Sequence, residues 1–166
     1  HLEVTKNTAM TPITFNWTAW SSGVLNSTSS VYTSGDSAHY SSIVIDSNDK
    51  AHIVFYRDDN SNLMYSTNKS GSWATSSIET SNNVGKYCNL AIDSNDGLHV
   101  SYQYNSGNAL KYAYKSASSS SWSKTTIDNT GGKFTSIAID SNDKPHIAYR
   151  DSGGDLGYAE KTGSRR

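Results

Sequence analysis

Apolar and polar residues alternate over short stretches along most of the chain, and turn-forming residues separate these stretches. In Ser136–Tyr149, for example, Ile137 and Ile139 occupy alternate positions, which is the two-residue period of a β-strand with one buried face. Such stretches follow one another at intervals of about 8–12 residues, as the strands of all-β domains do. No segment carries a 3.6-residue period, so the pattern predicts an all-β fold without helices.

The alternation recurs as a long repeat. The pentapeptide Ile45–Asp49 (IDSND) returns at Ile92–Asp96 and at Ile139–Asp143, a spacing of 47 residues each time (92 − 45 and 139 − 92). Each repeat contains strand-like pieces of the forms SIAID, HIAY and LxYA, and the first two repeats also contain WxxxxI. The turn between the first two pieces is Ser-Asn-Asp followed by Lys or Gly, and these residue types favour tight turns.

Four strands in a unit of 40–50 residues are typical of a β-propeller blade. The text SIAIDSNDKPHIAY, followed by LGYAEK, resembles the NHL and Asp-box (sialidase-like) groups of propeller repeats. The resemblance covers roughly residues 28–162 and implies that the first strand of each blade lies near the central channel and the last at the rim. We therefore expect an extra strand within residues 1–20 and three blades within residues 21–166. The expected repeats lie near 28–67, 75–114 and 124–161.

Three blades raise the question of how the ring closes. Residues 42–79 and 89–128 each contain all four pieces, whereas residues 136–162 contain three. Thr28–Tyr32 precedes the first inner strand, as every fourth strand does. Propellers typically have 4–8 blades, so we expect a head-to-tail homodimer of six blades, in which Thr28–Tyr32 completes the last blade of the partner. The alternative, that the chain is a piece of a longer propeller, stays open.

Composition and charge narrow the possible functions. The chain has 166 residues, 34% of them hydrophobic, a formal net charge of −1, and a single cysteine, Cys88. These features argue against nucleic-acid binding, a membrane span of about 20 apolar residues, an intrachain disulfide and a cysteine-based zinc site. The chain begins at His1 without a charged and apolar leader, so we expect any targeting signal to be absent or already removed. The polar composition favours a secreted or cell-surface protein.

Two repeated positions carry groups that are able to bind metals. Each second strand opens with a histidine and each first strand ends with an aspartate; these are His52, His99, His146, Asp46, Asp93 and Asp140. Equivalent positions on successive blades do not converge, whereas zinc needs about four ligands at near 2.1 Å. We therefore interpret the six residues as structural, with each aspartate capping its own turn through backbone N–H groups. We expect no metal and no cofactor.

The loops between the second and third strands of each repeat carry groups that suit sugars. They supply the ligand-binding candidates Arg57, Asp58, Tyr104, Asn105, Arg150 and Asp151. Aromatic rings stack on the C–H faces of sugars, and Arg, Asn and Asp bind hydroxyl groups. The repeat is also similar in outline to six-bladed fucose-binding lectins, whose sites between blades use an Arg, a Glu and an aromatic residue. That resemblance implies a site of Arg150, Glu160 and Trp122.

The leading hypothesis is therefore a non-catalytic, carbohydrate-binding propeller with glycans as ligands. A structural or protein-interaction scaffold without a small ligand is the alternative. A fragment of a sialidase-like glycosidase is a third hypothesis. That family clamps its substrate with three arginines, but two of the four arginines here, Arg165 and Arg166, lie in an expected tail. No pair of carboxylates stands out from the repeat, so the sequence assigns no catalytic residue.

Overall fold

The computed structural model describes residues 30–33 and 38–161, which contain eleven strands and no helix. The strands form three antiparallel sheets, so the all-β prediction is confirmed. The first sheet contains β1 (Ala38–Ile45), β2 (Ala51–Arg57), β3 (Asn62–Thr67) and β4 (Ala74–Glu79). The second contains β5 (Val84–Ile92), β6 (Leu98–Tyr104), β7 (Ala109–Lys115) and β8 (Ser123–Asp128). The third contains β9 (Gly131–Ile139), β10 (Pro145–Asp151) and β11 (Leu156–Glu160).

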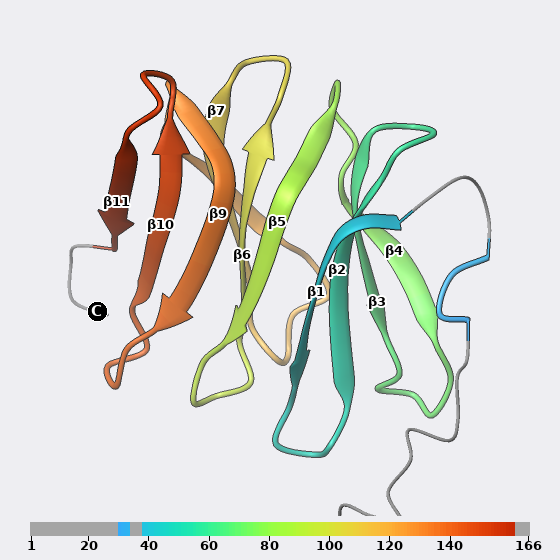
Figure 1. The fold of residues 1–166 in the computed structure, drawn as a ribbon. Helices are drawn as coiled ribbons and strands as arrows, with labels where there is room; N and C mark the ends of the chain where they lie inside the picture. Colours follow the sequence, from blue (N-terminus) through green and yellow to red (C-terminus); the bar gives the residue numbers. More distant parts are fainter. Residues whose placement is uncertain (1–29, 34–37, 162–166) are drawn as a thin grey trace, which may run out of the picture. The chain divides into compact units, whose positions relative to one another are not determined.

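Each sheet is a meander in which consecutive strands are neighbours. The first strands of the three sheets, β1, β5 and β9, lie side by side (Figure 1) and are called the inner strands below. Hairpins between the second and third strands lie at one end of the sheets, where the inner strands begin. Turns between the first and second strands lie at the opposite end. The two sets of candidate residues from the sequence therefore lie at different ends.

The hydrophobic core lies between successive sheets. One cluster joins the first and second sheets and includes Val54, Leu63 and Val100, all fully buried. A second cluster joins the second and third sheets around Leu110 and Ile137. Each sheet therefore depends on its neighbour for much of its burial.

Two glycines let the inner strands approach the preceding sheet. Gly85 in β5 and Gly132 in β9 have φ angles of +106° and +92°, which favour glycine. A Cβ atom on Gly85 would lie 2.6 Å from Cβ of Leu63, and one on Gly132 would lie 2.7 Å from Cα of Leu110. The backbones of β5 and β9 therefore pack directly on a buried leucine of the sheet before them.

The N-terminal predictions fall largely outside the described residues. The extra strand expected within residues 1–20 lies there, and so do the first two residues of the strand expected at Thr28–Tyr32. The described part, Ser30–Thr33, forms no strand. The ring of Tyr32 lies 5.3 Å from the ring of Phe55 and beneath the guanidinium of Arg57, at 5.5 Å, within the same chain. Among the described residues, no helix is long and apolar enough to cross a membrane.

Candidate functional site

An aromatic row crosses the inner strands near their first residues. The rings of Tyr40 and Tyr87 have centroids 4.6 Å apart, and those of Tyr87 and Phe134 are 4.5 Å apart. Tyr40 is 42% exposed and Phe134 is 61% exposed. Partial burial and the neighbouring Tyr87 raise the pKa of Tyr40 above its ordinary value, so its phenol stays neutral. The row is a strip of three neighbouring rings, tilted by 53° and 52° to one another, whose two end rings are exposed to solvent.

Backbone irregularity positions these rings. All three aromatic residues have positive φ angles, between 52° and 55°, and the strand register of β1 and β5 shifts around Tyr40 and Tyr87, as in a β-bulge. The next residue along then bonds the preceding sheet: Cys88 Sγ donates to the Tyr40 carbonyl at 2.8 Å, and Thr135 Oγ1 to the Tyr87 carbonyl at 2.7 Å. Burial raises the pKa of the Cys88 thiol to about 12, so it keeps the proton that it donates.

Sequence reasoning missed the aromatic row. Its signal is an aromatic residue that recurs every 47 residues (87 − 40 and 134 − 87), a few positions before each IDSND motif. A non-glycine residue with positive φ costs of order 1 kcal/mol, and such strain is more common at functional sites than elsewhere. Three equivalent residues share that conformation here.

Charged residues lie at the first-sheet end of the aromatic row. Asp58 Oδ2 lies 3.9 Å from Nε2 of His39, the residue before Tyr40. Arg57 Nη2 donates to Asp59 Oδ2 at 2.5 Å, and the Nε of Arg57 is buried without a hydrogen-bond partner among the described residues. Of the two candidates predicted here, Asp58 is therefore beside the row, and Arg57 is engaged by Asp59.

At the third-sheet end, a cavity of about 270 Å³ opens beside Phe134. Tyr149, Arg150 and Asp155 also line it, so an aromatic ring, a guanidinium and a carboxylate share one space. Arg150 Nε donates to the Gly154 carbonyl at 3.4 Å, which leaves the rest of the guanidinium available. The candidate Asp151 has a different role, since its Oδ1 accepts the backbone N–H of Asp155 at 2.9 Å and caps the hairpin.

The second-sheet candidates, Tyr104 and Asn105, lie in the loop between β6 and β7. The ring of Tyr104 packs directly on Gly107 and fills the space that a side chain there would need. The ammonium of Lys111 lies 5.6 Å from the centre of the Tyr104 ring. The backbone N–H of Asn105 donates to the Asn83 carbonyl at 2.9 Å. These contacts hold the loop at the same end of the sheets as the aromatic row.

The structure does not bring Arg150, Glu160 and Trp122 together. Arg150 pairs with Leu156 at one end of the β10–β11 ladder, whereas Glu160 pairs with His146 at the other end. Four residues of strand separate those ends, about 13 Å. Trp122 precedes β8 and packs edge-on against Tyr65 of the first sheet, with centroids 5.4 Å apart. The antiparallel register therefore separates the groups that the lectin resemblance would combine.

The repeated His and Asp residues lie beside a tyrosine in each sheet. In the second sheet, His99 Nε2 lies 3.1 Å from Asp93 Oδ2, and its Nδ1 lies 2.7 Å from the Tyr112 hydroxyl. Asp46, His52 and Tyr65 form the same hydrogen-bonded triad in the first sheet. In the third sheet His146 Nδ1 lies 2.7 Å from the Tyr158 hydroxyl, but its Nε2 lies 3.4 Å from Asp140 Oδ2 and has no hydrogen-bond partner among the described residues. In each sheet the second aspartate oxygen accepts two backbone N–H groups of the turn that follows. The described residues contain no group of three or more ligating side chains suited to a metal.

No protein-family model matches the chain, and no curated protein matches it significantly. Among solved structures, the chain is similar to the crystal structure of an exo-beta-1,3-galactanase from Clostridium thermocellum, with a TM-score of 0.53 and 12% sequence identity. The alignment covers 76% of this chain and 35% of the galactanase chain, so the chain spans about a third of the length of that protein. At this identity the similarity shows the fold alone.

Proposed function

We propose that this chain is a carbohydrate-binding β-propeller module that acts without catalysis. The propeller assignment is supported by the meander order of each sheet, by the adjacent inner strands and by the repeated contacts between successive sheets. The similar solved structure is named as a galactanase, a protein that acts on a carbohydrate, which agrees with the ligand class.

The observation that carries the proposal is the aromatic row. Its three rings form a continuous apolar strip on which the C–H face of a sugar can stack. Hydrogen-bonding groups lie at both ends: Asp58 beside Tyr40, and Arg150 beside Phe134. Sugar sites combine these two features, because a sugar ring has apolar faces and a polar edge.

The distribution of carboxylates supports binding without hydrolysis. A glycosidase needs two carboxyl groups about 5–9.5 Å apart across the scissile bond. Asp58 and Asp155, the carboxylates at the two ends of the row, come from the first and third sheets, with the second sheet between them. Asp59 and Asp151 are engaged by Arg57 and by the β10–β11 hairpin.

A glycan array that includes beta-1,3-linked galacto-oligosaccharides, followed by calorimetric titration of the hits, tests the proposal. We expect binding at millimolar concentrations or below, and a loss of at least tenfold in the variants Tyr87→Asn and Phe134→Asn. Asn removes the ring but tolerates a positive φ angle better than most residues, so the backbone is preserved. Phe134→Tyr, which keeps the ring, is the matched control and should bind normally.

Three results would overturn parts of this proposal. If no glycan on the array binds at millimolar protein concentration, the result would favour a protein-interaction scaffold. Full binding by both Asn variants would remove the aromatic row as the site. Release of reducing sugar from a bound oligosaccharide would show catalysis.

A further inference from the structure

Both junctions between sheets use the same polar pair. The backbone N–H and hydroxyl of Ser47, in the turn after β1, donate to the Asp96 carboxylate at 2.9 and 2.5 Å. Ser94 makes the same two bonds to Asp143, both at 2.8 Å. Each pair links the turn of one sheet to the corresponding turn of the next sheet.

The first and third sheets each contain one residue equivalent to a member of this pair that makes no such bond among the described residues. Ser141 is the third-sheet equivalent of Ser47 and Ser94, and Asp49 is the first-sheet equivalent of Asp96 and Asp143. Both are exposed, at opposite ends of the row of sheets. A second copy whose first sheet followed this third sheet would bring its Asp49 to Ser141.

Apolar side chains on the outer sheets show the same pattern. Leu156 is 87% exposed, whereas its equivalents Leu63 and Leu110 are fully buried by the sheet that follows them. Ile43 is 59% exposed, whereas its equivalents Leu90 and Ile137 are 5% and 7% exposed. Leu156 belongs to the last sheet and Ile43 to the first. Each exposed residue therefore occupies a position that a neighbouring sheet covers elsewhere in the chain.

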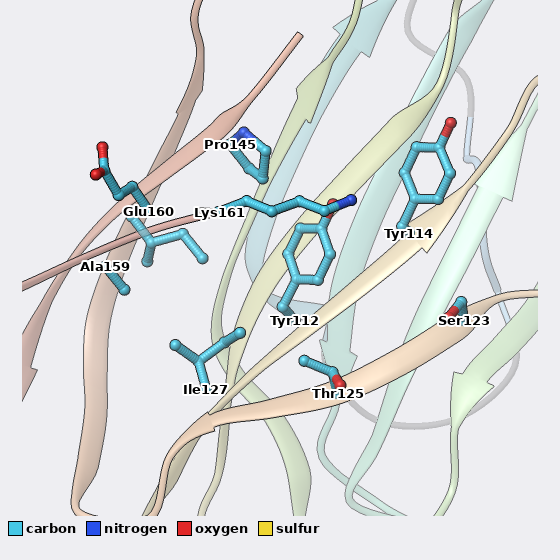
Figure 2. Close-up of a pocket in the computed structure, with 10 residues that line it drawn as sticks. Tyr112, Tyr114, Ser123, Thr125, Ile127, Pro145, Ala159, Glu160 and Lys161 are labelled. Carbon is cyan, nitrogen blue, oxygen red and sulfur yellow. The ribbon is translucent and has the colours of Figure 1, made fainter. Parts of the chain in front are cut away.

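A cavity of about 270 Å³ lies between the second and third sheets, next to β11, the edge strand of the third sheet (Figure 2). Tyr112, Ile127 and Glu160 are among its lining residues. Between the first and second sheets, the equivalent space contains Trp122. Trp122 packs on Tyr65 and belongs to the same hydrophobic cluster as Ile78. Ile78 is accordingly 5% exposed, whereas its equivalent Ile127 is 42% exposed. The cavity thus corresponds in position to the space that Trp122 fills at the first junction.

The sequence contains one further segment with the pattern of a fourth strand. Trp73 and Trp122 are each followed five positions later by Ile and then by an acid, in Trp73–Glu79 and Trp122–Asp128. Trp20–Asn26 has the same spacing, with Leu in place of Ile and Asn in place of the acid. It ends twelve residues before β1 (38 − 26).

A compensating change in β2 supports this alignment. The acids at the ends of β4 and β8 accept a hydroxyl from the next sheet: Tyr102 donates to Glu79 and Tyr149 to Asp128, both at 2.6 Å. The equivalent of Tyr102 in the first sheet is Phe55, which has no hydroxyl. In the Trp20–Asn26 alignment, Asn26 takes the position of the acid. Phe55, which has no hydroxyl to donate, would therefore face a residue without a carboxylate.

We propose that two copies of this chain associate head to tail, with Trp20–Asn26 of each copy inserted beside β11 of the other and Trp20 in the cavity against Tyr112. The same copy supplies Asp49 to Ser141. Two copies of the three described sheets give six blades, within the 4–8 blades of most propellers. The inference rests on the propeller assignment made above but not on carbohydrate binding. It takes Trp20–Asn26 in place of Thr28–Tyr32 as the closing strand, because Ser30–Tyr32, the described part of the latter, forms no strand.

Cysteine cross-linking tests the junction directly. We expect the double variant Asp49→Cys and Ser141→Cys to run as a covalent dimer of about 36 kDa on a non-reducing gel, twice the 18.0 kDa of one chain. The matched control, Ser47→Cys with Asp96→Cys, joins the same positions within one chain and should run as a monomer. Because Cys88 is buried, it does not compete.

Light scattering of the unmodified chain should give the mass of a dimer. Trp20→Ala should shift it towards a monomer with an unchanged far-ultraviolet circular dichroism spectrum, whereas Trp17→Ala should leave the dimer intact. A monomer at all concentrations, or a ladder of open oligomers in the cross-linking experiment, would overturn the proposal. Neither measurement involves a sugar, so failure here is distinct from failure of the carbohydrate proposal.

Discussion

The second and third sheets have the same sequence pattern and differ in what covers them. The second sheet lies between two others, and its Asp93 and His99 side chains are 0% and 4% exposed. The equivalent Asp140 and His146 of the third sheet are each 29% exposed and lie 3.4 Å apart, without the hydrogen bond that joins Asp93 and His99. Leu110 is fully buried and Leu156 is 87% exposed, although both occupy the same position in the repeat.

The comparison separates two sources of structure. The turns and their aspartate caps form in each sheet from residues that are close in sequence, whether or not a following sheet is present. Burial depends on the neighbouring sheets, and at the leucine position it depends on the sheet that follows. Substitutions at equivalent positions in the two sheets should therefore lower the free energy of unfolding by different amounts. The size of that difference measures how much the next sheet stabilises the position.

The largest difference is expected at the leucine position. Leu110→Ala should lower the free energy of unfolding by about 2–5 kcal/mol, because it removes a fully buried side chain and leaves a cavity. Leu156→Ala should change it by less than about 1 kcal/mol, since that side chain is largely in water. Urea unfolding at low protein concentration, below dimer formation, measures both variants. Equal losses would contradict the comparison.

The features that are local in sequence were predictable. Alternating residues and turn residues gave the strands of the repeat, because both signals act within about ten residues. Turn caps such as Asp93, which accepts the N–H groups of Asn95 and Gly97, likewise involve residues two and four positions apart.

Features that depend on contacts between sheets were not predictable from the repeat. The bulge at Tyr40 is fixed by Cys88, 48 residues away, so the alternation around Tyr40 gives no sign of it. The alternation also specifies which face of a strand a residue occupies but not which partner covers that face. The lectin resemblance places Trp122 in a ligand site, and the alternation gives no sign that it packs against Tyr65 instead.

A smaller difference is expected at the tyrosine position of the second strand. Tyr102 is fully buried and donates to Glu79, which also receives bonds from Lys111 and Ser81. Burial disfavours the charged form of Glu79, but these bonds outweigh it and lower the pKa. Tyr102→Phe should therefore cost about 1–3 kcal/mol, as expected for removing a partner of a buried charge.

Tyr149→Phe is the matched variant in the third sheet. The bond to Asp128, together with burial, raises the pKa of Tyr149 to about 12. Asp128 keeps the bonds from the backbone N–H and hydroxyl of Thr130 when the Tyr149 hydroxyl is removed. The free energy of unfolding should therefore fall by about 0.5–1.5 kcal/mol. Thermal unfolding of both variants at pH 7 measures the difference. A larger loss of stability from Tyr149→Phe than from Tyr102→Phe would show that the greater burial of Tyr102 does not set the cost of losing the hydroxyl.

The smallest effect is the pH dependence of the sheltered triad. Burial lowers the pKa of His99 below its ordinary value of 6.5, and the opposing effect of Asp93 does not cancel it. As pH falls below 6.5, the unfolded chain takes up a proton at His99 before the folded chain does, so stability falls in that window and is complete above it. Bonds that outweigh burial lower the pKa of Asp93 from 3.8, so its contribution is lost only at more acidic pH. Nuclear magnetic resonance titration of the His99 ring should therefore give a midpoint below 6.5, with lower urea stability at pH 5.5 than at pH 7. A midpoint at or above 6.5 would mean that the neighbouring sheets do not shelter this triad.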